Sequence, residues 1–142
     1  MWAIVPIKDF TDAKGRLSKV LTPAERESLA RAMFQDVLDA LMETSGLDGI
    51  AVMTRDIDAQ SLCADMGFRV LTEERNKGQT TAVMTASQSL RQEGVEGVLT
   101  IPGDVPLVSP KDIEVVLDKH LRAPSMTIVP ARDYQGSNCI VC

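Results

Sequence analysis

The stretch WAIVPIKDFTDAKGRL, residues 2–17, decides the fold, and the rest of the sequence can be placed around it. Residues 2–7 are apolar without alternation, which is typical of a strand buried on both faces. Pro6, near the end of the run, suits a strand terminus. Three cations follow within nine residues: Lys8, Lys14 and Arg16. The stretch therefore predicts a buried strand that leads into a basic loop.

The basic loop, residues 8–16, predicts a site for an anion. The chain has a net charge of −5, so a local cluster of cations stands out against an acidic background. Arginine offers a planar fork to phosphate oxygens and lysine a mobile point charge, which makes a polyphosphate the natural ligand. Gly15 would let the backbone approach that ligand closely. Charge alone leaves open a solvated loop that Asp9 and Asp12 offset.

Composition restricts the class of protein. A chain of 142 residues with 44% hydrophobic and 25% charged residues fits one globular domain with its own core. No apolar run approaches the ~20 residues of a membrane-spanning helix, and no signal peptide is evident, so we expect a cytoplasmic protein. The acidic net charge disfavours nucleic acid and leaves small anions as the expected partners. A homodimer is left open.

The three cysteines and the single histidine favour structural roles. An odd number of cysteines cannot form a closed disulfide framework. Cys139 and Cys142 have a C-x-x-C spacing, but in a strand they would point to opposite faces, so we expect core packing and no shared metal. His120 lies near a predicted helix C-terminus, where a satisfied or dipole-stabilised side chain is expected.

Apolar strands alternate with amphipathic helices along the whole chain. Strands are predicted at residues 2–7, 49–54, 68–72, 97–101, 126–129 and 138–142. Helices are predicted after Thr22, Asp56, Gly78 and Ser109. Thr22 and Ser109 each precede a proline and stand three residues before an acid, the arrangement of a capping box. In the first helix Leu29, Met33, Val37 and Leu41 are expected to face the core, with Gly46 as the stop.

This alternation predicts an α/β fold: a three-layer, open, mostly parallel sheet with helices on both faces. Ligands of such sheets sit beyond the carboxyl ends of the strands. The basic loop, the loop at Gly78, Asp104 and the loop at Gly136 all follow predicted strands. One edge of the sheet should therefore gather them.

Asp104 is the acid that this arrangement singles out. It follows the strand predicted at residues 97–101, which is expected to be buried, with Gly103 permitting close approach and Pro106 stiffening the turn. A carboxylate beside a triphosphate is chiefly useful as an oxygen ligand of Mg²⁺. A turn-forming aspartate that bonds its own backbone is the alternative. Cations, one metal-binding acid and glycine loops together favour nucleotide binding with phosphoryl or nucleotidyl transfer.

Other nucleotide and catalytic motifs are missing. The sequence contains neither G-x-x-x-x-G-K-[ST] nor G-x-G-x-x-G, which disfavours a Walker ATPase and a dinucleotide dehydrogenase. The sequence has a single histidine and no other sign of a serine–histidine–acid catalytic triad, so such a triad is disfavoured.

Five motifs, in order and at their spacing, closely resemble the 2-phospho-L-lactate guanylyltransferase family, which serves coenzyme F420 biosynthesis and has a glycosyltransferase-A-like nucleotidyltransferase fold. Some bacterial members use phosphoenolpyruvate. The motifs are VPIK (5–8), AKGRL (13–17), LTPAER (21–26), GDVPLV (103–108) and GSN (136–138). The match spans nearly the whole chain.

The resemblance implies a role for each loop. GTP phosphates would be held by Lys8, Lys14 and Arg16, of which Lys14 and Arg16 would act in catalysis with Asp104. Asp104 would bind Mg²⁺. The residues near the base would be Gly78, Gln79 and Thr80, and those that contact the acceptor would be Gly136, Ser137 and Asn138. Relatives often have Leu-Asn in place of Gln79-Thr80 and threonine in place of Ser137.

The family also continues past Cys142 with a segment that includes a second metal-binding acid. Residues 1–142 are thus expected to be a single nucleotidyltransferase-like domain without that segment. The main hypothesis is transfer of GMP from GTP to 2-phospho-L-lactate, with release of pyrophosphate. Alternatives are the same chemistry on phosphoenolpyruvate, 3-phosphoglycerate or a molybdopterin-type acceptor, a non-catalytic nucleotide-binding domain, and a purely structural domain.

Overall fold

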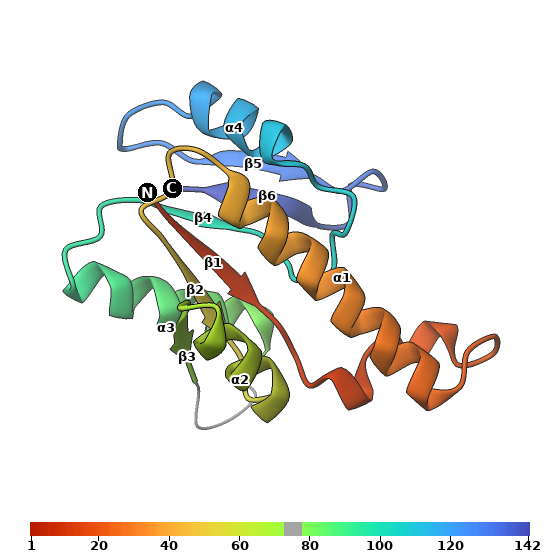
Figure 1. Cartoon of the computed structure of the whole chain (residues 1–142). Coiled ribbons are helices and arrows are strands. Elements are labelled where there is room, and N and C mark those ends of the chain that lie inside the picture. Colours follow the sequence, from red (N-terminus) through yellow and green to blue (C-terminus); the bar gives the residue numbers. More distant parts are fainter. Residues whose placement is uncertain (73–77) are drawn as a thin grey trace.

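One six-stranded sheet in the order β3-β2-β1-β4-β6-β5 organises the residues described by the computed structural model, 1–72 and 78–142 (Figure 1). Its strands are β1 (Trp2–Pro6), β2 (Gly49–Met53), β3 (Arg69–Leu71), β4 (Val98–Thr100), β5 (Thr127–Pro130) and β6 (Ser137–Val141). Each lies within about two residues of a predicted strand.

Helices cover both faces of the sheet, as predicted. They are α1 (Pro23–Glu43), α2 (Ile57–Asp65), α3 (Gln79–Gln92) and α4 (Pro110–Lys119). Side chains of α1, α2 and α4 share one core cluster with the sheet, and α3 forms a second cluster on the opposite face (Figure 1). Two short 3-10 turns, η1 (Phe10–Asp12) and η2 (Gly15–Leu17), lie between β1 and α1.

The first four strands are parallel, and β1, β2 and β4 are the most deeply buried of them. β1 pairs in parallel with both β2 and β4, and β2 pairs in parallel with β3. Val5 of β1 packs into the α1 cluster, whereas Ile4 packs into the α3 cluster. This explains why the run has no polar alternation: each face of the strand meets a helical layer.

The last two strands form an antiparallel hairpin. β6 is antiparallel to β4 and to β5, so β5 runs in the direction of β4. The turn between β5 and β6, which contains Gly136, therefore lies at the carboxyl edge of the parallel strands. The topology confirms that one edge of the sheet gathers the loops that follow the strands.

The capping box of α1 is present, but its buried face differs from the predicted one. Thr22 Oγ1 accepts a hydrogen bond from the Glu25 amide, and the Glu25 carboxylate accepts one from the Thr22 amide. The helix ends at Glu43, three residues before Gly46. Leu29 and Met33 are only half-buried. Instead, Phe34 is fully buried beside Val37 and Leu41, because its ring packs against a residue of the basic loop, described below.

Cys139 and His120 occupy structural positions, as predicted, but the expectation of core packing is wrong for Cys142, which lies past the end of β6. Cys139 is buried on β6, and Cys142 is exposed. Burial raises the pKa of the Cys63 and Cys139 thiols to about 11. His120 is the C-cap of α4, and its Nδ1 lies 2.9 Å from Thr127 Oγ1. Among the described helices none has the length and hydropathy that crossing a bilayer would require.

Candidate functional site

A cavity of about 580 Å³ opens at the carboxyl edge of β1, β2 and β4. Its walls come from five separate parts of the chain, together with Ala30 of α1 and Ala82 of α3. These parts are residues 6–10, 13–14, 53–55, 78–79 and 102–104. The volume is in the range of small-molecule sites. Loops that are distant in sequence thus meet at one place, as expected for a ligand site of an open α/β sheet.

Lys14 and Asp104, which both line this cavity, form an ion pair. Lys14 Nζ lies 2.8 Å from Asp104 Oδ2, although the two residues are 90 positions apart. The lysine side chain is 21% exposed and the aspartate side chain 57% exposed. Both groups therefore remain accessible to a ligand while they neutralise each other.

The backbone of Lys14 is left-handed, with φ +56° and ψ +36°. A non-glycine residue in this region is strained, and such strain is concentrated at functional sites. Gly15, expected to allow close approach of a ligand, is exposed and lies outside the cavity lining. The left-handed conformation that turns the chain toward Asp104 is therefore adopted by Lys14 itself.

The N-terminus of α3 faces the cavity through Gly78 and Gln79. Gly78 has a φ of +93°, a conformation that side chains rarely adopt. The amides of the first helical turn and the helix dipole favour a negative group at this position. The residues that precede Gly78, 73–77, lie outside the described part of the chain.

Gly103 serves packing more than ligand approach. A Cβ atom at this position would lie 3.0 Å from both Ile7 Cδ1 and Phe34 Cδ2. The glycine thus lets the loop after β4 lie directly on the core, and Asp104 follows it at the cavity rim. The sequence prediction that Gly103 permits close approach is correct, but the neighbour is the protein's own core.

Cations exceed acids among the described residues that line the cavity. The lining contains three cations, Lys8, Lys14 and Arg55, and two acids, Asp9 and Asp104. Arg55 was missed by sequence reasoning, which considered the loops after the other strands. The signal was available, because Arg55 follows β2 as Lys8 follows β1. This surplus of positive charge suits an anionic ligand.

A divalent metal fits this site only together with a ligand. In the described part of the chain, no group of three or more His, Cys, Asp and Glu side chains is placed to hold a metal ion. Asp104 supplies one accessible carboxylate at the rim. One or two carboxylates, waters and substrate phosphates make up the usual Mg²⁺ donor set in nucleotide enzymes. The residues present therefore fit a magnesium ion that a nucleotide brings with it.

The other predicted site residues lie outside the cavity lining. Arg16 is exposed in η2, two residues from Lys14, and so belongs to the same edge. Thr80 is exposed in the first turn of α3. Gly136, Ser137 and Asn138 lie at the β5–β6 turn and the start of β6. Of the ten predicted positions, the cavity thus brings together Lys8, Lys14, Gly78, Gln79 and Asp104.

Comparison with known proteins decides the family. All 142 residues match the family described as "Guanylyl transferase CofC like". The chain belongs to the CofC family. It is 38% identical over 138 residues to the phosphoenolpyruvate guanylyltransferase of Conexibacter woesei, covering 96% of this chain and 62% of that protein. It is 34% identical over 139 residues to the 2-phospho-L-lactate guanylyltransferase of Methanothermobacter thermautotrophicus, covering 98% and 60%.

Solved structures show the same fold for this CofC chain. A Desulfovibrio desulfuricans G20 protein assigned as a nucleotide-diphospho-sugar transferase matches with a TM-score of 0.78 at 19% identity, covering 99% of this chain and 62% of that one. A nucleotidyl transferase from Methanothermobacter thermautotrophicus matches with a TM-score of 0.62 at 18% identity, covering 92% and 62%. The CofC chain spans about three fifths of the length of the curated relatives that it matches.

Proposed function

We propose that this CofC protein transfers GMP from GTP to a phosphorylated three-carbon acid, with release of pyrophosphate, in the cytoplasm and as a step of coenzyme F420 biosynthesis. The observation that carries the proposal is the Lys14–Asp104 pair, set in a cavity that the N-terminus of α3 also faces. A cation, a carboxylate and helix amides are the groups that a magnesium-bound triphosphate needs.

The reaction requires alignment and charge neutralisation more than a base. A phosphate oxygen of the acceptor would attack the α-phosphorus of GTP, and the bond from that phosphorus to the bridging oxygen of the β-phosphate would break. The acceptor oxygen is already anionic, so no proton has to be removed. Lys8 and Lys14, with Arg16 from the same loop, would stabilise the charge on the departing pyrophosphate.

The ion pair gives Lys14 and Asp104 a defined exchange of partners. In the free protein each neutralises the other at 2.8 Å. When the triphosphate enters, Lys14 would leave the carboxylate for phosphate oxygens, and Asp104 would become available as a metal ligand. Mg²⁺ bound there would polarise the phosphoryl group and offset its charge. The base would lie by Gly78, Gln79 and Thr80, and the acceptor by Gly136, Ser137 and Asn138.

The acceptor is the part of the proposal that competing substrates can test. We favour 2-phospho-L-lactate from the motifs, and phosphoenolpyruvate is the second candidate because the relative at 38% identity is named for it. Pyrophosphate release with GTP and Mg²⁺ should be measured for each acceptor separately and for both together. 3-Phosphoglycerate and a molybdopterin-type acceptor serve as comparisons.

We expect pyrophosphate release with at least one of the two favoured acceptors. Release with none of the four acceptors, while GTP still binds, would favour the non-catalytic nucleotide-binding domain. A structural domain predicts that GTP with Mg²⁺ gives no thermal shift at all.

A further inference from the structure

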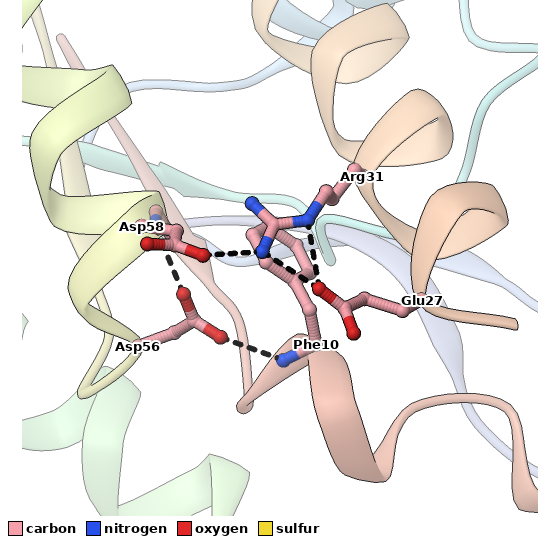
Figure 2. Close-up of polar contacts among 6 residues, drawn as sticks. Phe10, Glu27, Arg31, Asp56 and Asp58 are labelled. Atoms are coloured by element: carbon pink, nitrogen blue, oxygen red, sulfur yellow. Dashed lines mark hydrogen bonds and ion pairs between the residues drawn. The ribbon is translucent and has the colours of Figure 1, made fainter. Parts of the chain in front are cut away.

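Phe10 anchors the basic loop from its middle. It lies between Lys8 and Lys14, which both line the cavity, and only 1% of its surface is exposed. Its backbone N–H donates a hydrogen bond of 2.8 Å to Asp56 Oδ2 (Figure 2). The two residues are 46 positions apart, so this bond ties the loop after β1 to the loop after β2.

Asp56 uses both of its carboxylate oxygens. Oδ1 accepts a hydrogen bond of 3.0 Å from the Ala59 amide, as the N-cap of α2. Oδ2 accepts from Phe10, and the Asp56 amide donates to Thr54 Oγ1 at 3.1 Å. Sequence reasoning accounted for the cap alone. A cap needs one oxygen, as the hydroxyls of Thr22 and Ser109 show in this chain, so the second oxygen has another purpose.

The Phe10 ring is held by two side chains of α1. The ring centroids of Phe10 and Phe34 of α1 are 5.7 Å apart. The guanidinium carbon of Arg31 lies over the Phe10 ring, 4.7 Å from its centroid. Arg31 in turn forms ion pairs with Glu27 of α1 and Asp58 of α2 (Figure 2). Phe10 is thus fixed by its backbone at Asp56 and by its ring at α1.

We infer that Asp56 is a positioning residue for nucleotide binding: by holding the Phe10 amide, it sets the backbone of residues 8–14 so that Lys8 and Lys14 face the triphosphate. The inference rests on the proposed function and assigns to it a residue outside the cavity lining. Without the bond, the loop must become ordered when the nucleotide binds, which weakens affinity.

An electrostatic role and a positioning role for Asp56 predict opposite changes in GTP affinity when its carboxylate is removed. Asp56 follows Arg55, a residue that lines the cavity. The negative charge of Asp56 would therefore repel an anionic nucleotide in the cavity. If charge were its only influence on the site, removal of the carboxylate would tighten GTP binding. If Asp56 positions the loop, removal weakens GTP binding although a repulsive charge has gone.

The variants Asp56→Ser and Asp56→Thr separate the two roles of Asp56. Each hydroxyl can cap α2 in the way that Ser109 and Thr22 cap their helices, but neither supplies a second oxygen to Phe10. Asp65→Asn is the matched control, because it removes one exposed carboxylate from the other end of the same helix. Each substitution is introduced into the chain as its natural gene encodes it.

Two measurements test the inference on the folded proteins. Calorimetry with GTP and Mg²⁺ should show the Kd rising about tenfold in both hydroxyl variants, the scale of one hydrogen bond to a charged group. Hydrogen exchange by NMR should show that the Phe10 amide loses protection while the Ala59 amide keeps it. Asp65→Asn should change neither quantity.

Unchanged or tighter GTP binding in the hydroxyl variants would overturn the inference, as would a Phe10 amide that stays protected. These outcomes are distinct from failure of the proposed function. If the natural protein does not bind GTP, the proposed function falls and the positioning role falls with it. If it binds GTP and the variants bind equally well, only the positioning role is lost.

Discussion

The parallel strands and the β5–β6 hairpin contribute differently to the same edge of the sheet. β1 and β2 are buried along four of their five residues, and the loops that follow them line the cavity. β5 has no buried residue, and the hairpin turn lies outside the cavity lining. Central strands between two helical layers can hold charged side chains in fixed positions, whereas an edge hairpin has only one neighbouring strand.

The contrast suggests a division of labour between these regions. The parallel strands would bind the nucleotide, and the hairpin would contact the acceptor. Substitutions in the two regions should then alter different constants, which the first three of the following measurements test. The fourth asks how readily the hairpin opens.

The largest expected effect is that of Asp104→Asn, at the end of the parallel region. Loss of the carboxylate should lower kcat/KM by about a hundredfold or more, since charge stabilisation in such sites is worth this much. Pyrophosphate release measured over a range of GTP concentrations, at saturating acceptor, gives this ratio. Asp118→Asn, an exposed change on α4, is the control. Full activity in Asp104→Asn would remove the proposed metal role.

A matched pair of arginines tests the division directly. Arg55 lines the cavity, and Arg132 is exposed in the hairpin loop. Arg55→Ala should raise the Kd of GTP about tenfold, as expected when a charge-assisted contact is lost. Arg132→Ala should leave that Kd within about twofold, because exposed distant charges are screened. Equal effects in a calorimetric titration would break the comparison.

Ser137→Ala should affect the acceptor alone. Removal of one neutral hydrogen bond should raise the KM of the acceptor about fivefold. The Kd of GTP should not change, because Ser137 lies outside the cavity lining. Steady-state kinetics with varied acceptor and a separate GTP titration give both numbers. A change in GTP affinity would show that the two regions are not independent.

The smallest expected effect is on the reactivity of the thiols, and its measurement does not involve enzyme activity. Burial raises the pKa of Cys63, in α2, and of Cys139, in β6, to about 11, so each is almost entirely a protonated thiol at pH 8. A thiol reagent should react quickly with exposed Cys142 and slowly with the two buried thiols until the protein unfolds. Rapid labelling of Cys139 and slow labelling of Cys63 would show that the hairpin opens far more readily than α2.

The sequence predicted the layers and the shared edge, because unbroken apolar runs and capping boxes are local signals. It could not predict which loop cation meets Asp104, since that depends on the left-handed backbone of Lys14. Phe34 was overlooked in favour of Met33, because its burial depends on a ring from another segment. The second partner of Asp56 was invisible for the same reason: the cap is local, and the bond to Phe10 spans 46 residues.

The pairing of Lys14 with Asp104 also bears on how the site responds to ionic strength. Added salt would screen the proposed attraction between the cavity cations and GTP, but it would also loosen the bond that occupies Lys14 in the free protein. The two influences oppose each other. The affinity for GTP should therefore fall less steeply with salt than the number of cations alone would suggest. The internal ion pair would thus reduce the dependence of GTP affinity on the surrounding electrolyte.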